Sequence, residues 1–452
     1  MSMRHGFGLG LRMTAASLAL MAATSARAGT LGTEFQVNTY TSLNQYQIGR
    51  AICLAADGDF VVVWHSDANQ DGNGQGIFGQ RYVSSGTPNG TEFQVNTYTS
   101  GYQSDPAVCC QADGDFVVTW TDGSFNGSIR AQRFASSGAF LGTEFQVNGY
   151  TAAGSNSDIC CAADGDFVVV WSNYTGLVSG RRFASGGAPQ GTEFQVSTYT
   201  GLSLEPGVCC DAAGDFVVAW SEYRPGSGVF DFDVFARRYA SNGAARGTEF
   251  QVNTYTTGFQ GQSTRRNAEN QAICCDQAGD FTVAWQFQAN TYTFIDTEIH
   301  AQRFTSTGAF RGEEFQVNAH TAAYQRSPAA CCGAKGDFVI VWAGSSSESS
   351  YGGLSIFGRS FGSTGAPLTG DFQVNTYTGG GMYYPTNACA PDGSFVVSWS
   401  QYPGEDGSRA GVFAQRFLPP ALVPTPALSW VGLASVVAGL LGVGFGAFRR
   451  RK

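Results

Sequence analysis

The sequence predicts an all-β protein of seven similar units that close into a ring, and three observations support this. An EFQV-type segment, an apolar run ending in tryptophan, and an arginine close to an aromatic residue recur in that order seven times, with the tryptophans 49 to 65 residues apart. Each unit contains four short runs rich in β-branched and aromatic residues. The first and last segments of the repeat complete each other. Four strands per unit, repeated radially, are typical of a seven-bladed β-propeller. The tryptophans are Trp64, Trp120, Trp171, Trp220, Trp285, Trp342 and Trp399.

The second unit shows the four expected antiparallel strands. AVCC (107–110) and FVVTW (116–120) are joined by a turn that contains Asp-Gly, and IRAQRF (129–134) follows as the third strand. A Gly/Ser-rich turn leads to the EFQVN strand (144–148), in which polar and apolar residues alternate. No stretch of about 12 residues between these runs has the apolar period of a helix.

The order of the segments predicts how the ring closes. The chain begins its repeats with an isolated EFQVN at 34–38 and ends them with an isolated GVFAQRF at 411–417. If EFQVN is the outermost strand of each blade, the N-terminal copy supplies the strand that the last blade lacks, which leaves no open sheet edge. A stacked β-solenoid is the competing architecture, but it does not need this overhang.

Composition and charge limit the function classes. The chain has 452 residues, 60 glycines, 13% aromatic residues and only 13% charged residues, which suits a β core with many tight turns better than disorder. The formal net charge is −9, and basic residues cluster only at the last four positions. We therefore expect no nucleic-acid partner. The repeat makes residues 29–418 one closed domain.

Both ends of the chain indicate export. Basic residues, an apolar run and an A-x-A site predict a signal peptide at 1–28. At the other end, a Pro-rich linker (419–426) precedes an uncharged segment (427–448) long enough to span a bilayer, and a basic tail (449–452) that is expected on the cytoplasmic side. This predicts contact with the inner membrane before any processing. A plain transmembrane anchor is the alternative to a sorting signal.

The C-terminal order of VPTP, SWVGL with its apolar run, and RRRK resembles the sorting signals of bacterial PEP-CTERM and IPTL-CTERM proteins, although VPTP replaces their tetrapeptide. The repeat over 30–417 is also similar to repeats of large exported bacterial surface proteins. The resemblance implies a Gram-negative protein that is handled by export and sorting machinery. It would then lie in the cell envelope, on the outer surface, or be secreted.

The twelve cysteines fall in the first strand of each unit, mostly as neighbouring pairs. Adjacent residues of a strand point to opposite faces, so a vicinal pair offers one thiol to each neighbouring blade. We call the two places of the vicinal pair the first and second positions. If the cysteine at the first position of each blade bonds to the cysteine at the second position of the next blade, every cysteine is paired. This predicts six inter-blade disulfides and an oxidising compartment. The pairs are Cys53–Cys110, Cys109–Cys161, Cys160–Cys210, Cys209–Cys275, Cys274–Cys332 and Cys331–Cys389.

Two other roles for the cysteines were weighed. Free cysteine packs as a small hydrophobe, so a ring of buried thiols is an alternative. Zinc is disfavoured because vicinal cysteines lack the usual gap between zinc ligands. In the disulfide scheme, Leu54 and Ala388 would face each other at the one interface without a bridge.

One face of the propeller should carry the variable loops, between the second and third strands and between successive blades. Binding residues concentrate on such loops, although these could equally be tolerant connections without a function. The aromatic residues predicted to bind a ligand there are Tyr223, Phe230, Phe232, Tyr292, Phe294 and Tyr351.

The loop after Trp64 has the spacing of a calcium site. Asp67, Asn69, Asp71 and Asn73 place oxygen-bearing side chains at alternate positions, and the loop resembles those of integrin-type FG-GAP propellers. It departs from them in having no acidic residue at the last ligand position. A polar turn without metal is the alternative, and we expect no other cofactor.

The sequence gives little indication of catalysis. The histidines of the mature chain, His65, His300 and His320, fall in unrelated loops. An aspartate and an arginine recur once per unit, and residues needed in nearly every unit are more often structural partners than catalytic groups. The acidic pair Asp231 and Asp233 would suit a glycoside hydrolase, but nothing fixes its geometry.

These observations predict a non-enzymatic envelope or extracellular propeller that binds a glycan or a surface protein through its variable loops. A secreted polysaccharide hydrolase or lyase on the same scaffold is one alternative, and a purely structural matrix component is another. Carboxylates that converge at the mouth of the channel would favour the enzyme, whereas a flat aromatic rim would favour binding.

Overall fold

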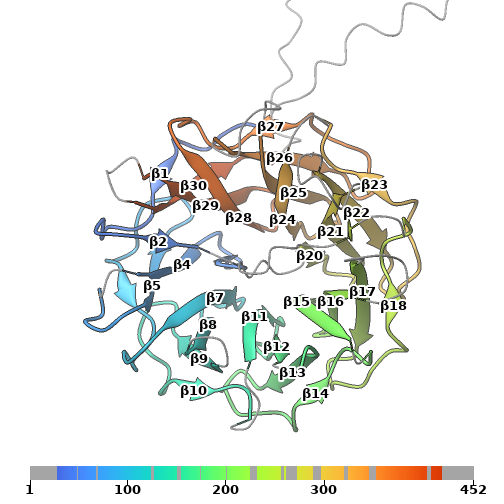
Figure 1. Cartoon of the computed structure of the whole chain (residues 1–452), viewed down its shortest axis with the longest axis horizontal. Helices are drawn as coiled ribbons and strands as arrows, with labels where there is room; N and C mark the ends of the chain where they lie inside the picture. Colours follow the sequence, from blue (N-terminus) through green and yellow to red (C-terminus); the bar gives the residue numbers. More distant parts are fainter. Residues whose placement is uncertain are drawn as a thin grey trace, which may run out of the picture.

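The structure, a computed structural model, describes residues 28–419 except 48, 68–69, 124–126, 150–153, 174, 200, 224–231, 256–258, 261–271, 289–296, 320–323, 346–352 and 405–408. Seven antiparallel sheets stand in a ring around a central channel (Figure 1). The described residues form strands and turns and contain no helix. The predicted seven-bladed β-propeller is confirmed.

Each blade has four strand positions from the channel outward, and in two blades the innermost strand is split. The innermost strands are β2 (Gln45–Tyr46) with β3 (Ile52–Leu54), β7 (Gln103–Cys110), β11 (Gly154–Cys161), β15 (Leu202–Cys210), β19 (Phe259–Gln260) with β20 (Ala272–Cys275), β24 (Gln325–Cys332) and β28 (Gly381–Cys389). The second strands are β4 (Phe60–Ser66), β8 (Phe116–Asp122), β12 (Phe167–Asn173), β16 (Phe216–Tyr223), β21 (Phe281–Gln288), β25 (Phe338–Gly344) and β29 (Phe395–Tyr402). The third strands are β5 (Gly76–Tyr82), β9 (Ser128–Phe134), β13 (Val178–Phe183), β17 (Phe232–Tyr239), β22 (Thr297–Phe304), β26 (Ser355–Phe361) and β30 (Gly411–Phe417). The outermost strands are β6 (Phe93–Gln94), β10 (Phe145–Gln146), β14 (Phe194–Gln195), β18 (Phe250–Gln251), β23 (Phe315–Gln316), β27 (Phe372–Gln373) and β1 (Phe35–Gln36).

The N-terminal strand closes the ring as predicted. In Figure 1, β1 lies beside β30 at the outer edge of the last blade, where Phe35 pairs with Ala414 and Gln36 with Phe413. The backbone N–H of Leu31 donates to the carbonyl of Arg416 at 2.8 Å and continues the pairing. The first and last segments of the domain therefore share one sheet.

Apolar side chains fill the spaces between blades. Between the first and second blades, Val61 and Val63 of β4 pack against Val118 and Trp120 of β8. All seven repeat tryptophans are at most 1% exposed. Burial of a large apolar side chain contributes about 1.5–3 kcal/mol, so these interfaces supply the main stabilisation of the ring.

The repeated aspartate and arginine are structural partners, as predicted. The Asp115 carboxylate accepts a 2.8 Å hydrogen bond from the Ser136 N–H, which ties the first turn of its blade to the third. The Arg133 guanidinium donates at 2.9 Å to the Gly186 carbonyl in the next blade. Asp59, Asp166, Asp215 and Asp280 accept the corresponding hydrogen bond in their blades.

The acidic residue that opens each EFQV-type segment, a glutamate in six and Asp371 in the last, joins neighbouring blades. Glu314 accepts hydrogen bonds from the N–H (2.6 Å) and the hydroxyl (2.8 Å) of Thr254, and its other oxygen lies 2.8 Å from Nδ1 of His300. Burial acts to raise the pKa of Glu314, but the hydrogen bonds from His300 and from the backbone and side chain of Thr254 lower it overall. At the ring closure, Glu34 accepts the same pair of bonds from Thr376.

We expect Glu314→Ala to lower the free energy of unfolding by about 1–3 kcal/mol, because it leaves the buried His300 without its charged partner and removes the link to Thr254. The neighbouring Glu313, which is exposed, supplies the matched control Glu313→Ala, for which little change is expected. Since the folded-state pKa of Glu314 is lowered, its contribution is present above its ordinary pKa and is lost as the pH falls through the folded value. Urea unfolding at neutral and acidic pH measures both effects. Equal stabilities of the two variants would contradict this role.

All six predicted disulfides are present, with Cα–Cα distances of 5.4 to 5.6 Å, and they include all twelve cysteines. The alternative of free thiols is therefore wrong. Leu54 and Ala388 pack against one apolar cluster at the seventh interface, which has no bridge. A chain stapled by six disulfides is typical of proteins that fold in an oxidising compartment, in agreement with export.

The predicted targeting segments lie almost entirely outside the described residues. Only residue 28 of the signal peptide and residue 419 of the linker are described, and the segments 427–448 and 449–452 are not. Within the described part of the chain, no helix is long and apolar enough to cross a membrane.

Candidate active site

The innermost strands are interrupted by a bulge at the same place in five blades. The register of β7 on β8 shifts between Ser104 and Ala107, and the other four blades repeat this shift. One non-glycine residue in each bulge has a positive φ, which strains an L-residue. Bulges redirect side chains beside many active sites. The strained residues are Asp105 (52°), Asn156 (54°), Glu205 (56°), Ser327 (54°) and Tyr384 (54°).

A tyrosine and a histidine face each other on the first blade. Tyr46 of β2 pairs directly with His65 of β4, and their rings are 5.6 Å apart. His65 is only 5% exposed, and among the described residues its Nδ1 has no hydrogen-bond partner. Its Nε2 is 3.9 Å from a carboxylate oxygen of Asp67. Directly opposed residues share one side of a sheet, so the two side chains can act on the same ligand.

Burial gives these two side chains opposite proton preferences. It lowers the pKa of His65 below the ordinary 6.5, although the carboxylates of Asp105 and Asp67 act in the other direction. Burial also raises the pKa of Tyr46 above 10.0, with further increases from Asp67 and Tyr402. At neutral pH, His65 is therefore a neutral base and Tyr46 a protonated acid, which is the combination that general acid–base catalysis requires.

Three adjacent innermost strands each carry an acidic residue. Asp105 on β7 is half-buried, and burial raises its pKa against the lowering effects of His65 and of the hydrogen bond from Ser104. Asp158 on β11 is 1% exposed, and Glu205 on β15 is 5% exposed. Asp158 and Glu205 are buried, so of these three carboxylates only Asp105 is partly exposed to solvent.

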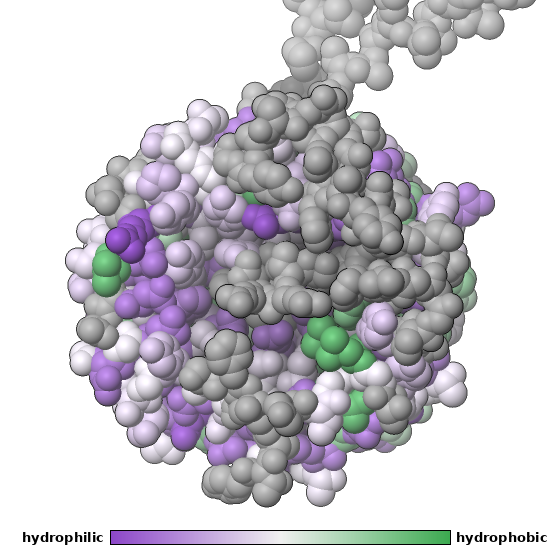
Figure 2. Space-filling model, viewed as in Figure 1, coloured by the Kyte–Doolittle hydropathy of each residue, from purple (hydrophilic) through white to green (hydrophobic). Residues whose placement is uncertain are grey.

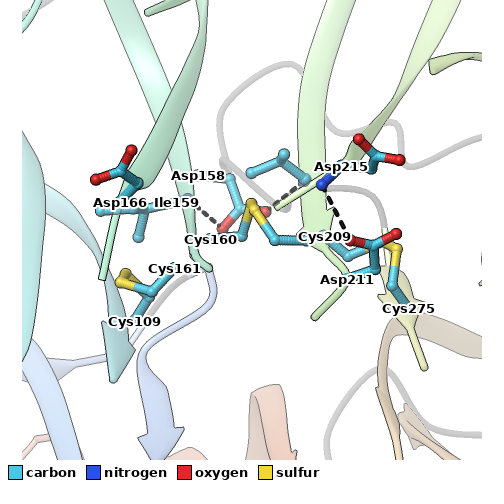
Figure 3. Close-up of a disulfide and its surroundings, with 12 residues drawn as sticks. Cys109, Asp158, Ile159, Cys160, Cys161, Asp166, Cys209, Asp211, Asp215 and Cys275 are labelled. Carbon is cyan, nitrogen blue, oxygen red and sulfur yellow. Dashed lines mark hydrogen bonds between the residues drawn. A yellow bond between two sulfur atoms is a disulfide. The ribbon is translucent and has the colours of Figure 1, made fainter. Parts of the chain in front are cut away.

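An arginine crosses the channel to reach Asp158. Arg50 donates to the carbonyl of Val208 at 2.7 Å and to that of Ile273, and its Nε is 3.9 Å from Asp158. Asp158 also accepts hydrogen bonds from the N–H groups of Ile159 (2.9 Å) and Val208 (2.8 Å), which Figure 3 shows beside the inter-blade disulfides. Burial raises its pKa despite these partners. With so many partners, Asp158 and Arg50 form a brace between blades and are not free to act on a substrate.

The strand position of Tyr46, opposite the residue that follows the repeat tryptophan, holds Arg326 in the sixth blade and Tyr383 in the seventh. Tyr46, Arg326 and Tyr383 each pair with the residue that follows the repeat tryptophan of their blade. They belong to the first, sixth and seventh blades, which are consecutive around the ring (Figure 1). The guanidinium carbon of Arg326 lies 5.2 Å from the ring centre of Tyr324 and 5.0 Å from that of Tyr383. We call Arg326, Tyr383, Tyr46 and His65 the mouth arc.

Hydrophilic residues predominate on the face turned to the viewer in Figure 2, and hydrophobic residues form only small, separate patches there. The described residues visible on this side therefore do not form one broad hydrophobic surface. This agrees with a polar site at the channel better than with a broad apolar binding surface.

The predicted aromatic ligand-binding set is only partly described. Tyr223 of β16 and Phe232 of β17 are paired, with ring centres 5.5 Å apart, on the fourth blade and away from the mouth arc. Phe230, Tyr292, Phe294 and Tyr351 lie outside the described residues. The structure thus brings two of the six together, and their binding role stays a prediction.

The predicted calcium loop is also incompletely described, because Asn69 lies outside the described residues. The oxygens of Asp67 accept hydrogen bonds from the side-chain amides of Gln75 (2.5 Å) and Asn44 (3.2 Å), and an oxygen of Asp71 caps the N–H of Asn73 at 3.1 Å. In the described part of the chain, no group of three or more His, Cys, Asp or Glu side chains is arranged to hold a metal. The calcium site stays a prediction.

The placement of the histidines in loops was wrong for two of the three. His65 lies in β4 and His300 in β22, because these strands extend further than the apolar runs suggest, and His320 is not described. His300 contacts Glu314 at 2.8 Å and Glu298 at 3.2 Å, so both ring nitrogens are occupied.

The acidic pair that would suit a glycoside hydrolase, Asp231 and Asp233, is only half described. Asp233 accepts a 2.7 Å hydrogen bond from Asn253, and Asp231 lies outside the described residues.

The sequence matches no protein-family model and no curated protein. In fold it is similar to a PL25 ulvan lyase bound to a sugar chain of GlcA and Rha3S (10% identity, 86% of this chain and 95% of that one, TM-score 0.50). It is also similar to a fungal alcohol oxidase of the AA5 family in complex with copper (13% identity, 88% and 79%, TM-score 0.48). A third similar structure is a GH93 α-L-arabinofuranosidase of Fusarium graminearum with arabinobiose (9% identity, 85% and 98%, TM-score 0.43).

These comparisons contradict our prediction of a non-enzymatic binding scaffold. At this identity the likeness shows a shared fold, and the activity remains that of the named protein, but the neighbour with a TM-score of 0.50 is a polysaccharide lyase. The prediction rested on the repeated positions and the loops. The Tyr46–His65 pair departs from the repeat and occurs in a single blade.

Proposed function

We propose that the protein is an exported enzyme that cleaves polysaccharide at the mouth of its channel, with Tyr46 and His65 as acid and base. The observation that carries the proposal is the direct pairing of a buried, neutral histidine with a tyrosine that keeps its proton. The pair suits β-elimination, the lyase reaction, better than hydrolysis. Elimination needs one base and one acid and no activated water.

The proposed reaction uses the two side chains in sequence on a uronic acid residue. The neutral imidazole of His65 removes the proton from C5, whose acidity comes from the adjacent carboxyl group. The C4–O4 bond breaks, a C4=C5 double bond forms, and the Tyr46 hydroxyl gives its proton to the departing oxygen. Proton exchange with solvent then restores neutral His65 and protonated Tyr46. Near-neutral operation follows from the opposite shifts of their pKa values.

A screen of uronate polysaccharides tests the proposal. The purified, disulfide-bonded protein is incubated with polygalacturonate, alginate, glucuronate-containing polymers and neutral polysaccharides, and the products are followed by reducing ends and by ultraviolet absorbance. New reducing ends with the absorbance of an unsaturated product identify a lyase. New reducing ends without it identify the hydrolase alternative, and no cleavage of any polymer, neutral ones included, would refute the proposal.

The pH dependence of kcat/KM follows from the two pKa shifts. Activity needs neutral His65, whose pKa is below 6.5, so activity is complete at neutral pH and falls as the pH drops through that lower value. It also needs the proton of Tyr46, whose pKa is above 10.0, so the alkaline decline begins only above that pH. A rate profile across the acidic and alkaline ranges measures both limits. An acidic limb centred above 6.5 would show that another group is the base.

We further propose that the protein is delivered to the envelope or outer surface of a Gram-negative bacterium, with the C-terminal 30 or so residues acting as a sorting signal. The order of proline-rich, apolar and basic segments in the sequence supports this. Mass analysis of the protein recovered from the cell surface tests it. Loss of the segment near 427–448 is expected, and its retention would favour the plain anchor.

A further inference from the structure

We propose that Arg326 and Ser327 form a binding subsite for an anionic group of the substrate, a carboxylate or a sulfate ester, beside the cleavage site. This inference rests on the proposed polysaccharide-cleaving function and names a substrate feature that the fold does not assign. It is argued from the partners, the burial and the position of these two residues.

Within the described part of the chain, no carboxylate pairs with the charge of Arg326. Among the described residues its contacts are the rings of Tyr324 and Tyr383, at 5.2 and 5.0 Å, and its Nε is buried with no hydrogen-bond partner. A partly buried guanidinium that lacks an anion is unfavourable unless a ligand supplies one. Other arginines of the domain have polar partners. Arg130 binds Asp122 at 2.7 Å and Glu144 at 3.0 Å, and Arg133 donates to the carbonyl of Gly186 at 2.9 Å.

Ser327, the next residue in the bulge, carries a second buried donor. It is 4% exposed, and its hydroxyl also has no hydrogen-bond partner in the described part of the chain. Its φ of 54° is strained, because this bulge residue is held in a conformation that L-residues rarely adopt. A guanidinium fork and a hydroxyl together match the oxygens of a carboxylate or a sulfate.

The surroundings suit a sugar ring that carries such a group. Two tyrosine rings contact the guanidinium and restrict its movement, so less side-chain freedom is lost on binding. Arg326 occupies in the sixth blade the position that Tyr46 occupies in the first, and Tyr383 occupies it in the blade between them. A polymer lying along the mouth arc would therefore place one charged sugar on Arg326 while a nearby linkage lies at Tyr46 and His65.

Equilibrium binding of defined oligosaccharides tests the subsite. The probes are an oligogalacturonate, the same oligomer with its carboxyl groups reduced to alcohols, and a sulfated neutral oligomer, each titrated into the full disulfide-bonded protein carrying His65→Ala so that cleavage does not interfere. We expect a charged oligomer to bind about 10- to 100-fold more tightly than the reduced one, as charge-assisted hydrogen bonds usually contribute. Which charged probe binds better identifies carboxylate or sulfate as the natural group.

Substitutions assign the selectivity to Arg326. Arg326→Met is expected to remove most of the difference between charged and reduced oligomers, and Arg326→Lys and Ser327→Ala part of it. Lys335→Met is the matched control, since it removes an exposed charge from the same blade and should leave the selectivity intact. The conservative Lys and Ala variants keep the test valid if the Met variant fails to fold. Equal binding of charged and reduced oligomers, or undiminished selectivity in Arg326→Met, would overturn the inference.

The outcomes for the subsite and for the proposed function are separable. Charge-selective binding without any cleavage would support the subsite and refute the catalytic proposal. Cleavage of neutral polymers with no charge selectivity would do the reverse. If both proposals hold, Arg326→Met raises KM for the acidic substrate with a small change in kcat, whereas His65→Ala lowers kcat.

Discussion

His65→Ala is expected to lower kcat/KM on the best uronate polymer by about 10²- to 10⁴-fold, the usual contribution of a general base. The imidazole is buried opposite Tyr46, and its Nδ1 has no partner within the described structure, so no neighbouring described side chain can replace it. Tyr46→Phe removes only the hydroxyl and should cause a loss of similar size, since the leaving oxygen then receives no proton. Initial rates at several substrate concentrations measure both losses.

Tyr98→Phe is the matched control for Tyr46→Phe. Tyr98 follows the EFQV segment of another blade and is 52% exposed, so its hydroxyl should not affect the rate. Thermal unfolding under non-reducing conditions shows whether each variant keeps the wild-type fold. A His65→Ala variant that folds normally and retains full activity would mean that the catalytic groups lie elsewhere on the propeller.

The fold could be predicted because each unit specifies its own strands and turns locally. The alternation of apolar residues in FVVTW and the Asp-Gly turn before it need no information from other blades. The disulfide pairing was also accessible, since the two-residue period of a strand assigns one cysteine of each vicinal pair to each neighbour. Closure followed from counting strands, because 34–38 and 411–417 each lack a partner within their own unit.

The candidate site could not be predicted in the same way, because it depends on departures from the repeat. Tyr46 belongs to β2, a short strand that is separated from β3, whereas the equivalent strand β7 is continuous. Its pairing with His65 requires β4 to extend beyond the apolar run, to Ser66. The variable composition after Trp64 led us to place His65 in a loop. A histidine directly after a repeat tryptophan, where other blades have residues such as Thr121 or Ser172, was the available signal.

Arg326 illustrates a second limit. The residues that flank it are Tyr324 in its own blade and Tyr383 in the next, and only the ring arrangement brings Tyr383 within 5.0 Å. Sequence patterns indicate which residues share a face of one strand, but they do not reveal that a cation is left without an anion. To find this, the hydrogen-bond and ion-pair partners of every nearby polar atom must be known, and only a structure gives them.

Replacing Cys209 and Cys275 together with alanine is expected to lower the free energy of unfolding by about 4 kcal/mol. The bridge, whose two cysteines are labelled in Figure 3, joins residues 66 positions apart, and cross-linking a loop of that length removes much of the entropy of the unfolded chain. Replacing both cysteines leaves no unpaired thiol to form wrong bridges. Urea unfolding without reductant measures the change. An unchanged urea concentration at the unfolding midpoint would show that this disulfide does not stabilise the contact between its two blades.

The seventh interface offers the complementary test, because it is the one where the ring is closed by β1 instead of a disulfide. Leu54 and Ala388 occupy there the positions that cysteines hold elsewhere, and both pack against the same apolar cluster. Leu54→Cys with Ala388→Cys should therefore form a seventh bridge, detectable as a cross-linked peptide in a non-reducing digest. Since β1 already restrains this interface, the gain in stability should be smaller than the loss caused by removing Cys209–Cys275. Two free thiols in the double variant would mean that the first and last blades meet in a different register from the other six interfaces.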